Sequence, residues 1–393
     1  MGLSVETVGV LLLVAAVVAM LARRFGVPYS VGLVVAGIGL ALLPFRPDIE
    51  LTKQLIFTVL LPPLIFEAAI QIRWRELRKE LVVIITLATV GVAISAAATA
   101  IGMHYLAQWG WISAVVFGVL IAATDPVSVI ATFKDAKVHG RIRLLVETES
   151  LFNDGTAAVA LAIVLGLLAG KSVGPFGAAK SFLIVSLGSL LCGAVVAGLV
   201  LLLIGATKDH LVEMTFSIVA AYGSFLTAEH FHLSGILATL TAGLVMGNVG
   251  HLAISSAGRR AVVELWEFAA FVANSLVFLL IGMRVTNQSY RPVLLPAAIA
   301  IVVVTLGRAL AIYPLSLLFA KSERRIKPTH QHILFWGGLR GALALALALG
   351  LPPDMAQRQE IITVAFAVVA FSILVQGMSI APVLRRTASG DTD

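Results

Sequence analysis

Long apolar runs repeat along the whole chain, and this repetition limits the possible folds more than any other feature. A run of about 18 apolar residues is long enough to cross a hydrocarbon core of roughly 30 Å as a helix. Of the 393 residues, 59% are hydrophobic and only 12% are charged, whereas soluble domains carry about 25% charged residues. The sequence therefore predicts an all-α polytopic membrane protein and excludes a soluble fold.

The hydropathy pattern predicts thirteen transmembrane helices joined by short connections. They are expected at 4–22, 28–44, 53–71, 81–107, 112–133, 144–169, 178–205, 212–230, 233–249, 261–283, 293–320, 330–350 and 359–384. The first run lacks the basic segment of a signal peptide and is predicted to be a retained helix. The single cysteine, Cys192, leaves no disulfide framework and no cysteine-based metal site. We expect one membrane domain over residues 1–393.

Basic residues are distributed unevenly between alternate loops. Nineteen of the 28 lysines and arginines fall in the odd-numbered loops and the C-terminal tail, and seven fall in the even-numbered loops. Because basic loops stay in the cytoplasm, the N-terminus is predicted outside the plasma membrane and the C-terminus in the cytoplasm. The same surplus accounts for the net charge of +7, so the expected surroundings are membrane lipid, and no nucleic-acid partner is needed.

Six of the ionisable residues inside the predicted spans are candidates for mid-membrane positions. They are Glu67, Asp125, Glu149, Asp154, Arg308 and Arg340. An ionised side chain at mid-membrane costs from about 2.5 to more than 10 kcal/mol, depending on how it is measured. Such residues persist where they pair, line water or act on a substrate, so they are the first candidates for the functional site.

The predicted helix at 144–169 carries the densest group of polar residues. At 100° per residue, Ser150 and Asp154 share one face, and Glu149 and Asn153 share a neighbouring face. A carboxylate beside a hydroxyl makes an oxygen-rich pocket of low charge. Oxygen ligands favour hard cations such as sodium over soft metals, so this helix is predicted to hold a monovalent cation.

The predicted helix at 112–133 contains a break. Pro126 lies in mid-span, where it removes one backbone hydrogen bond. Thr124 and Asp125 directly precede it, and helical geometry is disfavoured before proline. Irregular backbone at membrane depth is tolerated only where it is buried in protein or lines a cavity. Asp125 fits either compensation of the exposed backbone dipoles or ligation of a cation.

The predicted helix at 330–350 has a second break. Glycines 337, 338 and 341 surround Arg340, and each glycine weakens a helix by about 1 kcal/mol. Arg340, like Asp125, fits dipole compensation as well as a direct part in the site.

The two interrupted helices are seven spans apart and therefore run in opposite directions. Residues 1–170 and 212–385 are predicted to form an inverted repeat of two six-helix halves, with 178–205 as a linker helix and 386–393 as a short cytoplasmic tail. Interrupted helices at matching positions of two halves indicate the mid-membrane site of a secondary transporter.

Four sequence blocks resemble a known family. They are TDPVSVIATF, ETESLFNDGTAAV, WEFAAFVANSLVFLLIGM and GGLRGALALALAL. In this order they resemble the monovalent cation:proton antiporters, most closely the electroneutral sodium/proton exchanger branch in its short prokaryotic form. The resemblance covers essentially the whole chain. It implies a homodimer in which a six-helix core moves against a dimer domain.

The resemblance also assigns roles to individual residues. It implies ion ligands at Asp154, Ser150, Thr124 and Asp125, with sodium at the first three, and places Glu67 nearby as a gate, a distal ligand or only a partner.

The remaining site residues are implied as supports. The resemblance predicts an ion pair between Glu149 and Arg308, with Asn153 as a polar brace, and places Arg340 at the crossing of the two broken helices. The long regulatory tail of animal relatives is missing, so no regulatory C-terminal domain is expected.

We therefore expect a sodium/proton antiporter that needs no cofactor and exchanges one proton for one sodium or lithium ion, with both competing for Asp154. One-for-one exchange is expected because Asn153 stands where the electrogenic branch has a second aspartate. A potassium/proton antiporter of the same fold is the main alternative. A cation channel is less favoured because no pore-loop pattern occurs, and an enzyme is disfavoured because no nucleophile–base pair stands out.

Overall fold

The computed structural model describes residues 5–43, 51–125, 130, 133, 140–168, 174–286 and 288–380. Regular structure in these residues is helical throughout. Nine of the described helices are long and apolar enough to cross a membrane, and three shorter apolar helices accompany them. The predicted all-α polytopic fold is confirmed, and every predicted span coincides with at least part of a described helix. The predicted tail at 386–393 lies outside the described residues.

The chain divides into two compact units. The first comprises residues 1–56, 82–153 and 274–393, and the second comprises residues 57–81 and 154–273. Three of the described α-helices contribute residues to both units. These are α4 (Trp74–Thr86), α8 (Arg141–Leu168) and α12 (Ser256–Thr286).

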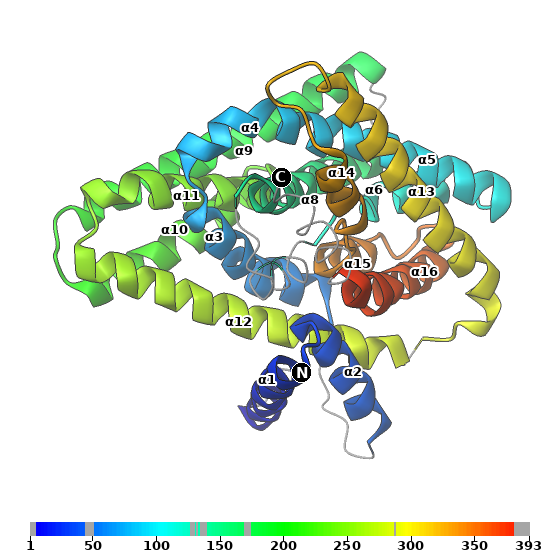
Figure 1. The fold of residues 1–393 in the computed structure, drawn as a ribbon, viewed down its shortest axis with the longest axis horizontal. Coiled ribbons are helices and arrows are strands. Elements are labelled where there is room, and N and C mark those ends of the chain that lie inside the picture. The colour runs from blue at the N-terminus through cyan, green and yellow to red at the C-terminus, as the bar shows by residue number, and fades with distance from the viewer. Residues whose placement is uncertain are drawn as a thin grey trace. The chain divides into compact units, whose positions relative to one another are not determined.

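The first unit surrounds the two interrupted spans. Its other helices are α1 (Val5–Phe25), α2 (Tyr29–Leu42), α5 (Val92–Leu106), α6 (Trp111–Leu120), α13 (Leu294–Leu318), α14 (Pro328–Trp336), α15 (Ala342–Leu349) and α16 (Arg358–Phe371). Helix α13 packs against α5, α14 and α16, while α15 packs against α6 and α16 (Figure 1). Every residue of α15 from Ala342 to Ala348 is buried, as expected of a helix that is apolar on all sides.

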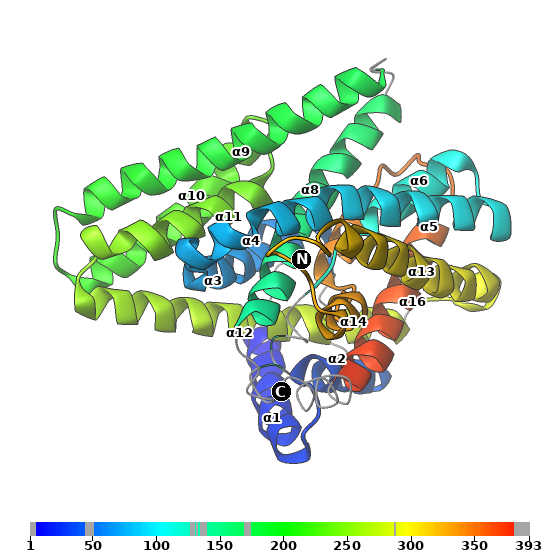
Figure 2. The ribbon, with the colours of Figure 1, turned by 45° about the horizontal axis from the view of Figure 1, so that its top comes forward.

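The second unit packs four helices around a core of aliphatic residues with one aromatic pair. They are α3 (Leu61–Gln71), α9 (Pro175–Ile204), α10 (His210–His230) and α11 (Gly235–Val249). Helix α11 contacts the other three, and α9, α10 and α11 lie side by side (Figure 2). In the core, the rings of Phe66 and Trp266 have centroids 4.6 Å apart. Trp266 Nε1 donates a 3.0 Å hydrogen bond to Ser217 Oγ, which satisfies its polar atom.

Local sequence explains several helix ends in the second unit. The side chain of Asp209 accepts a hydrogen bond from Leu211 N at the start of α10, and Ser234 accepts one from Leu237 N at the start of α11. Aspartate and serine are favoured at this position because they satisfy an otherwise unpaired helix N–H.

Helix α4 begins at Trp74, seven residues before the predicted start of its span at 81. The early turns read WRELRKE, which is rich in helix formers but polar, and a hydropathy criterion does not register such residues. The Oδ1 atom of Asn248 accepts a 2.6 Å hydrogen bond from Trp74 N. This bond from α11 stabilises the helix start at a place that the local sequence does not mark.

Candidate functional site

Both predicted helix breaks are present in the described residues. Helix α6 ends at Leu120, and residues 121–125 are not helical. Helices α14 and α15 are separated by residues 337–341, which are also not helical. Pro126, to which the first break was attributed, lies outside the described residues.

The two non-helical stretches are hydrogen-bonded to each other. Asp125 N donates to Leu339 O at 2.7 Å. The Nη1 atom of Arg340 donates to Ala122 O at 2.9 Å and more weakly to Ala123 O at 3.4 Å. Carbonyls at the end of a helix have no helical partner and carry partial negative charge. Arg340, only 2% exposed, therefore neutralises the end of α6 from the opposite stretch.

Two of the three glycines around Arg340 are required by close approach. A methyl group at Gly341 would overlap the side chain of Asp125. A methyl group at Gly338 would lie 2.5 Å from Nε of Arg308. These glycines therefore leave room for one side chain each, in addition to weakening the helix.

Helix α8 brings a hydroxyl to the first break. Ser150 Oγ and Thr124 Oγ1 lie 2.7 Å apart, within hydrogen-bond distance, and both residues are 2% exposed. Asp154 lies one turn beyond Ser150 on the same side of α8 and is 8% exposed. Two adjacent hydroxyl oxygens are ligands that a hard monovalent cation accepts, and the part of Asp154 as a third ligand stays a prediction.

A buried ion pair lies on the neighbouring face of α8. Arg308 on α13 donates from Nη1 to Oε1 of Glu149 at 2.7 Å and from Nη2 to Oε2 at 2.9 Å. The same Nη2 also donates to Leu334 O at 3.0 Å. Glu149 is 1% exposed and Arg308 is 6% exposed. This two-bond geometry satisfies most of the polar atoms of both charges, which burial requires.

Asn153 is bonded to this ion pair. Its Nδ2 donates to Oε1 of Glu149 at 3.4 Å, and its Oδ1 is buried with no hydrogen-bond partner among the described residues. Of the predicted supports, Glu149, Arg308 and Asn153 thus form one connected group, while Arg340 belongs to the crossing of the two broken helices.

Glu67 lies on α3 in the second unit and is partly buried. Its Oε1 accepts a hydrogen bond from Nε2 of Gln71, one turn along the same helix. Its part in an ion site therefore stays a prediction.

Two polar residues of the last span lie at the second break, although neither is a candidate from the sequence. Ser372 and Gln376 lie in the π-helical turn η5 (Ser372–Gln376), and Ser372 accepts a hydrogen bond from Arg340 N. A serine and a glutamine four residues apart were only a weak signal, because the same span also carries Thr363 and Ser379.

Comparisons with known proteins agree on one family. The sequence profile of the family described as "Sodium/hydrogen exchanger, transmembrane" matches residues 10–386. The Na(+)/H(+) antiporter ApNhaP of Aphanothece halophytica is 38% identical over 365 residues, which cover 92% of this chain and 70% of that protein. The Na(+)/H(+) antiporter NhaH of Halobacillus dabanensis is 31% identical over 390 residues, which cover 96% of each chain.

A solved structure shows the same fold. The sodium proton antiporter MjNhaP1 from Methanocaldococcus jannaschii, in its structure at pH 8, matches with a TM-score of 0.75 at 19% identity. The match covers 98% of this chain and 97% of the other.

Proposed function

This chain belongs to the sodium/hydrogen exchanger family, and on that premise we propose that it is a sodium/proton antiporter of the plasma membrane. It carries sodium, or lithium, in one direction and protons in the other by alternating access. The observation that supports this most strongly is the hydrogen-bonded crossing of two broken helices beside a buried pair of hydroxyls, because interrupted helices at membrane depth supply ion sites in secondary transporters.

The cation binds to Asp154, Ser150 and Thr124. The Thr124 and Ser150 hydroxyls share one hydrogen bond of 2.7 Å, so each oxygen keeps a lone pair for a cation. Asp154 supplies the charge from the same side of α8, one turn further on. Asp125 and Arg340 set the charge at the crossing, and Glu67 acts as a more distant ligand or gate.

Proton and cation compete for Asp154. A carboxylate holds either a proton or a sodium ion, and its charge is neutralised in both cases. If the protein switches between its outward-facing and inward-facing states only when this charge is neutral, one proton is exchanged for one cation. Asn153 supports the one-for-one ratio because it adds no second ionisable group, and its amide donates to Glu149 instead.

Glu149, Arg308 and Asn153 brace the site and do not carry the ion. The two bonds of Arg308 to Glu149 leave this carboxylate fully engaged. Paired buried charges of this kind are more suited to fixing structure than to binding a mobile ion.

The protein acts as a homodimer, with its N-terminus outside and its C-terminus in the cytoplasm. On α9, Leu187, Leu191 and Leu202 are each more than 60% exposed, which is compatible with a second copy as well as with lipid beside them. Cross-linking in native membranes tests the dimer, and labelling of single cysteines introduced at loops tests the orientation.

Purified protein in liposomes with an acidic interior tests the function. A pH-sensitive dye reports the gradient while sodium, lithium, potassium or choline is added outside. We expect sodium and lithium to collapse the gradient and choline to leave it intact. Collapse by potassium alone would favour a potassium/proton antiporter, and no collapse by any cation would contradict antiport.

A matched pair of variants tests the site in the same assay. Asp154→Asn removes the proposed proton carrier, and we expect no response to sodium. Glu76→Gln removes a carboxylate from the exposed ion pair with Arg73, and we expect the parent rate. An active Asp154→Asn variant would show that the ion site lies elsewhere.

A further inference from the structure

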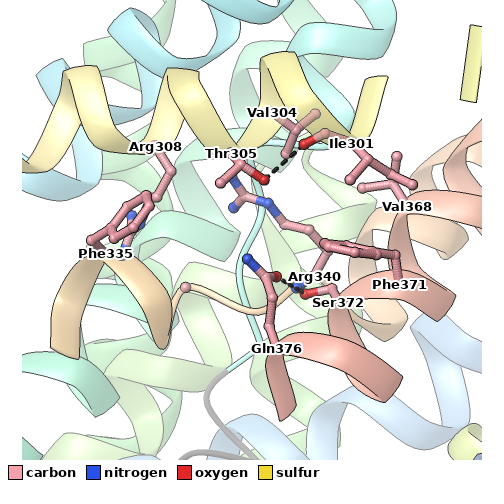
Figure 3. A pocket seen from close by; sticks show the side chains of 11 residues that line it. Ile301, Val304, Thr305, Arg308, Phe335, Arg340, Val368, Phe371, Ser372 and Gln376 are labelled. Atoms are coloured by element: carbon pink, nitrogen blue, oxygen red, sulfur yellow. Dashed lines mark hydrogen bonds between the residues drawn. The ribbon is translucent and has the colours of Figure 1, made fainter. Parts of the chain in front are cut away.

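The last span is bonded directly to the second helix break. Arg340 N donates to Ser372 Oγ at 2.8 Å, and Ser372 Oγ in turn donates to Oε1 of Gln376 at 2.7 Å. Figure 3 shows the Ser372 and Gln376 side chains pointing toward one another beside Arg340. The backbone of the break is thus connected through Ser372 to the amide of Gln376.

Ser372 uses its hydroxyl differently from Thr305 and Ser316, two other helix hydroxyls of the first unit. Thr305 donates to Ile301 O at 2.7 Å (Figure 3), and Ser316 donates to Ile312 O at 2.6 Å, each one turn back in its own helix. This bond is the usual one for a hydroxyl inside a helix. Ser372 instead donates forward to Gln376, so a lone pair of its oxygen faces the N–H of Arg340.

The backbone geometry around Ser372 is also unusual. Residues Ser372–Gln376 form a π-helical turn at the end of α16. Single π turns inside helices occur frequently at functional sites.

These bonds lie where there is little room for water. Ser372 is 1% exposed, Gln376 is 7% exposed and Arg340 is 2% exposed. The cavity beside them, which Arg308 and Arg340 also line, has a volume of about 10 Å³, which is room for about one water molecule. A buried N–H that loses its acceptor here is left unpaired unless that one water or a shift of the backbone supplies a new partner, and an unpaired buried N–H costs free energy.

We propose that Ser372 and Gln376 are positioning residues of the ion-exchange site, an inference that rests on the proposed antiport. They hold the backbone N–H of Arg340, and therefore fix where its guanidinium meets the carbonyl of Ala122. Because the same stretch pairs Leu339 O with Asp125 N, the last span sets the register between the two broken helices. Neither residue touches the ion.

The proposal predicts a change in cation affinity as well as in rate. Without the Ser372 hydroxyl, residues 337–341 relax and displace the carbonyls and Asp125 at the first break. Cation binding depends on small displacements of its ligands, so the apparent KM for sodium rises. A loss of folded protein alone lowers the maximal rate per milligram and leaves KM unchanged.

The test measures sodium KM and maximal rate in proteoliposomes for Ser372→Ala, Ser372→Thr and Gln376→Leu. We expect the sodium KM of Ser372→Ala to rise about fivefold, as for one lost buried hydrogen bond. The KM of Gln376→Leu is also expected to rise, because Ser372 loses its acceptor. Ser372→Thr keeps a hydroxyl and returns KM toward the parent value. Ser316→Ala is the matched control, since this equally buried hydroxyl bonds only to its own helix, and its KM stays at the parent value.

A double variant separates coupling from simple damage. Because Ser372 and Gln376 act in series, we expect Ser372→Ala/Gln376→Leu to raise KM no more than Ser372→Ala alone. The proposal would be overturned if the KM increases of the two single variants multiplied in the double variant. It would also be overturned if the variants kept the parent KM and had only a lower maximal rate. If the Ser372 variants are not monodisperse after purification, the sodium KM of Gln376→Leu is compared with that of Gln376→Glu. The second variant keeps an acceptor oxygen for Ser372, so its KM is expected to stay closer to the parent value.

Sodium exchange by the parent protein separates a failure of the positioning role from a failure of the proposed antiport. A parent that exchanges sodium while all Ser372 and Gln376 variants keep its KM contradicts the positioning role only. A parent that exchanges no cation contradicts the proposed function itself.

Discussion

Glu149 and Arg308 lie 159 residues apart in the chain and form a two-bond ion pair with N–O distances of 2.7 and 2.9 Å. Both side chains are almost completely buried. Such a pair contributes little net stability compared with apolar residues, but the loss of one partner leaves an uncompensated buried charge. The pair therefore makes α8 and α13 depend on each other.

Removal of one charge from this pair is expected to destabilise the protein strongly. In Glu149→Gln the guanidinium of Arg308 keeps its charge and loses its counter-ion, so we expect a loss of about 3–5 kcal/mol. Thermal unfolding in detergent measures this as a lower midpoint. Glu149→Gln combined with Arg308→Met removes both charges and is expected to recover most of the loss.

The exposed Arg73–Glu76 pair is the matched control for this measurement. Its side chains are 81% and 53% exposed, and exposed pairs contribute about 0–1 kcal/mol. Glu76→Gln should leave the unfolding midpoint near that of the parent. Equal effects of Glu149→Gln and Glu76→Gln would contradict the structural role of the buried pair.

A second prediction concerns the close approach at the crossing. In Gly341→Ala the added methyl group overlaps the Asp125 side chain and pushes the two broken helices apart. Because a displacement of about 1 Å at a reacting centre can cost a hundredfold in rate, we expect exchange to fall by about that factor.

Gly39→Ala on α2 controls for the general effect of replacing a helix glycine. An added methyl group at Gly39 meets no atom within 4 Å, and alanine favours a helix by about 1 kcal/mol. We expect unchanged exchange and equal or higher stability. Similar rates in both alanine variants would show that contact with Asp125 does not matter.

The hydroxyl pair at the first break supplies a third prediction. Thr124→Val and Ser150→Ala each remove one proposed ligand, so we expect apparent sodium KM to rise about tenfold or more. Thr124→Ser keeps the oxygen and should stay near the parent. Thr148→Val is the control on α8, because the buried Thr148 hydroxyl donates only to Leu144 O; a KM increase of the same size there would make the effect non-specific.

One-for-one exchange predicts insensitivity to membrane potential. A potassium diffusion potential of 100 mV, set by an ionophore, changes the driving force on one net charge by about 2.3 kcal/mol. We expect sodium-driven proton movement to keep its rate and end point when the potential is reversed. A large change with potential would exclude the one-for-one ratio.

The sequence predicted helices well because apolar length is a local property. The spans expected at 212–230 and 233–249 match α10 and α11 within about two residues. It was less accurate at Trp74, where a polar helical turn depends on a hydrogen bond with Asn248 on another helix.

The candidate site could be predicted only in part. Ionisable residues in apolar spans are conspicuous, so Glu149, Arg308 and Arg340 were identified. The backbone bond from Asp125 to Leu339 and the link from Arg340 to Ser372 were not. They depend on which segments meet in three dimensions, and neither backbone groups nor a single buried serine leave a distinctive sequence signal.

If proton and sodium compete for Asp154, the apparent KM for sodium depends on pH in a way that a purely structural role of Asp154 does not produce. The measurement follows proteoliposome exchange at saturating and limiting sodium over a series of pH values. In the acid range where Asp154 carries a proton, we expect KM to rise about tenfold per unit fall in pH, while the rate at saturating sodium stays constant. A KM that does not change with pH, with a maximal rate that falls instead, would contradict this competition.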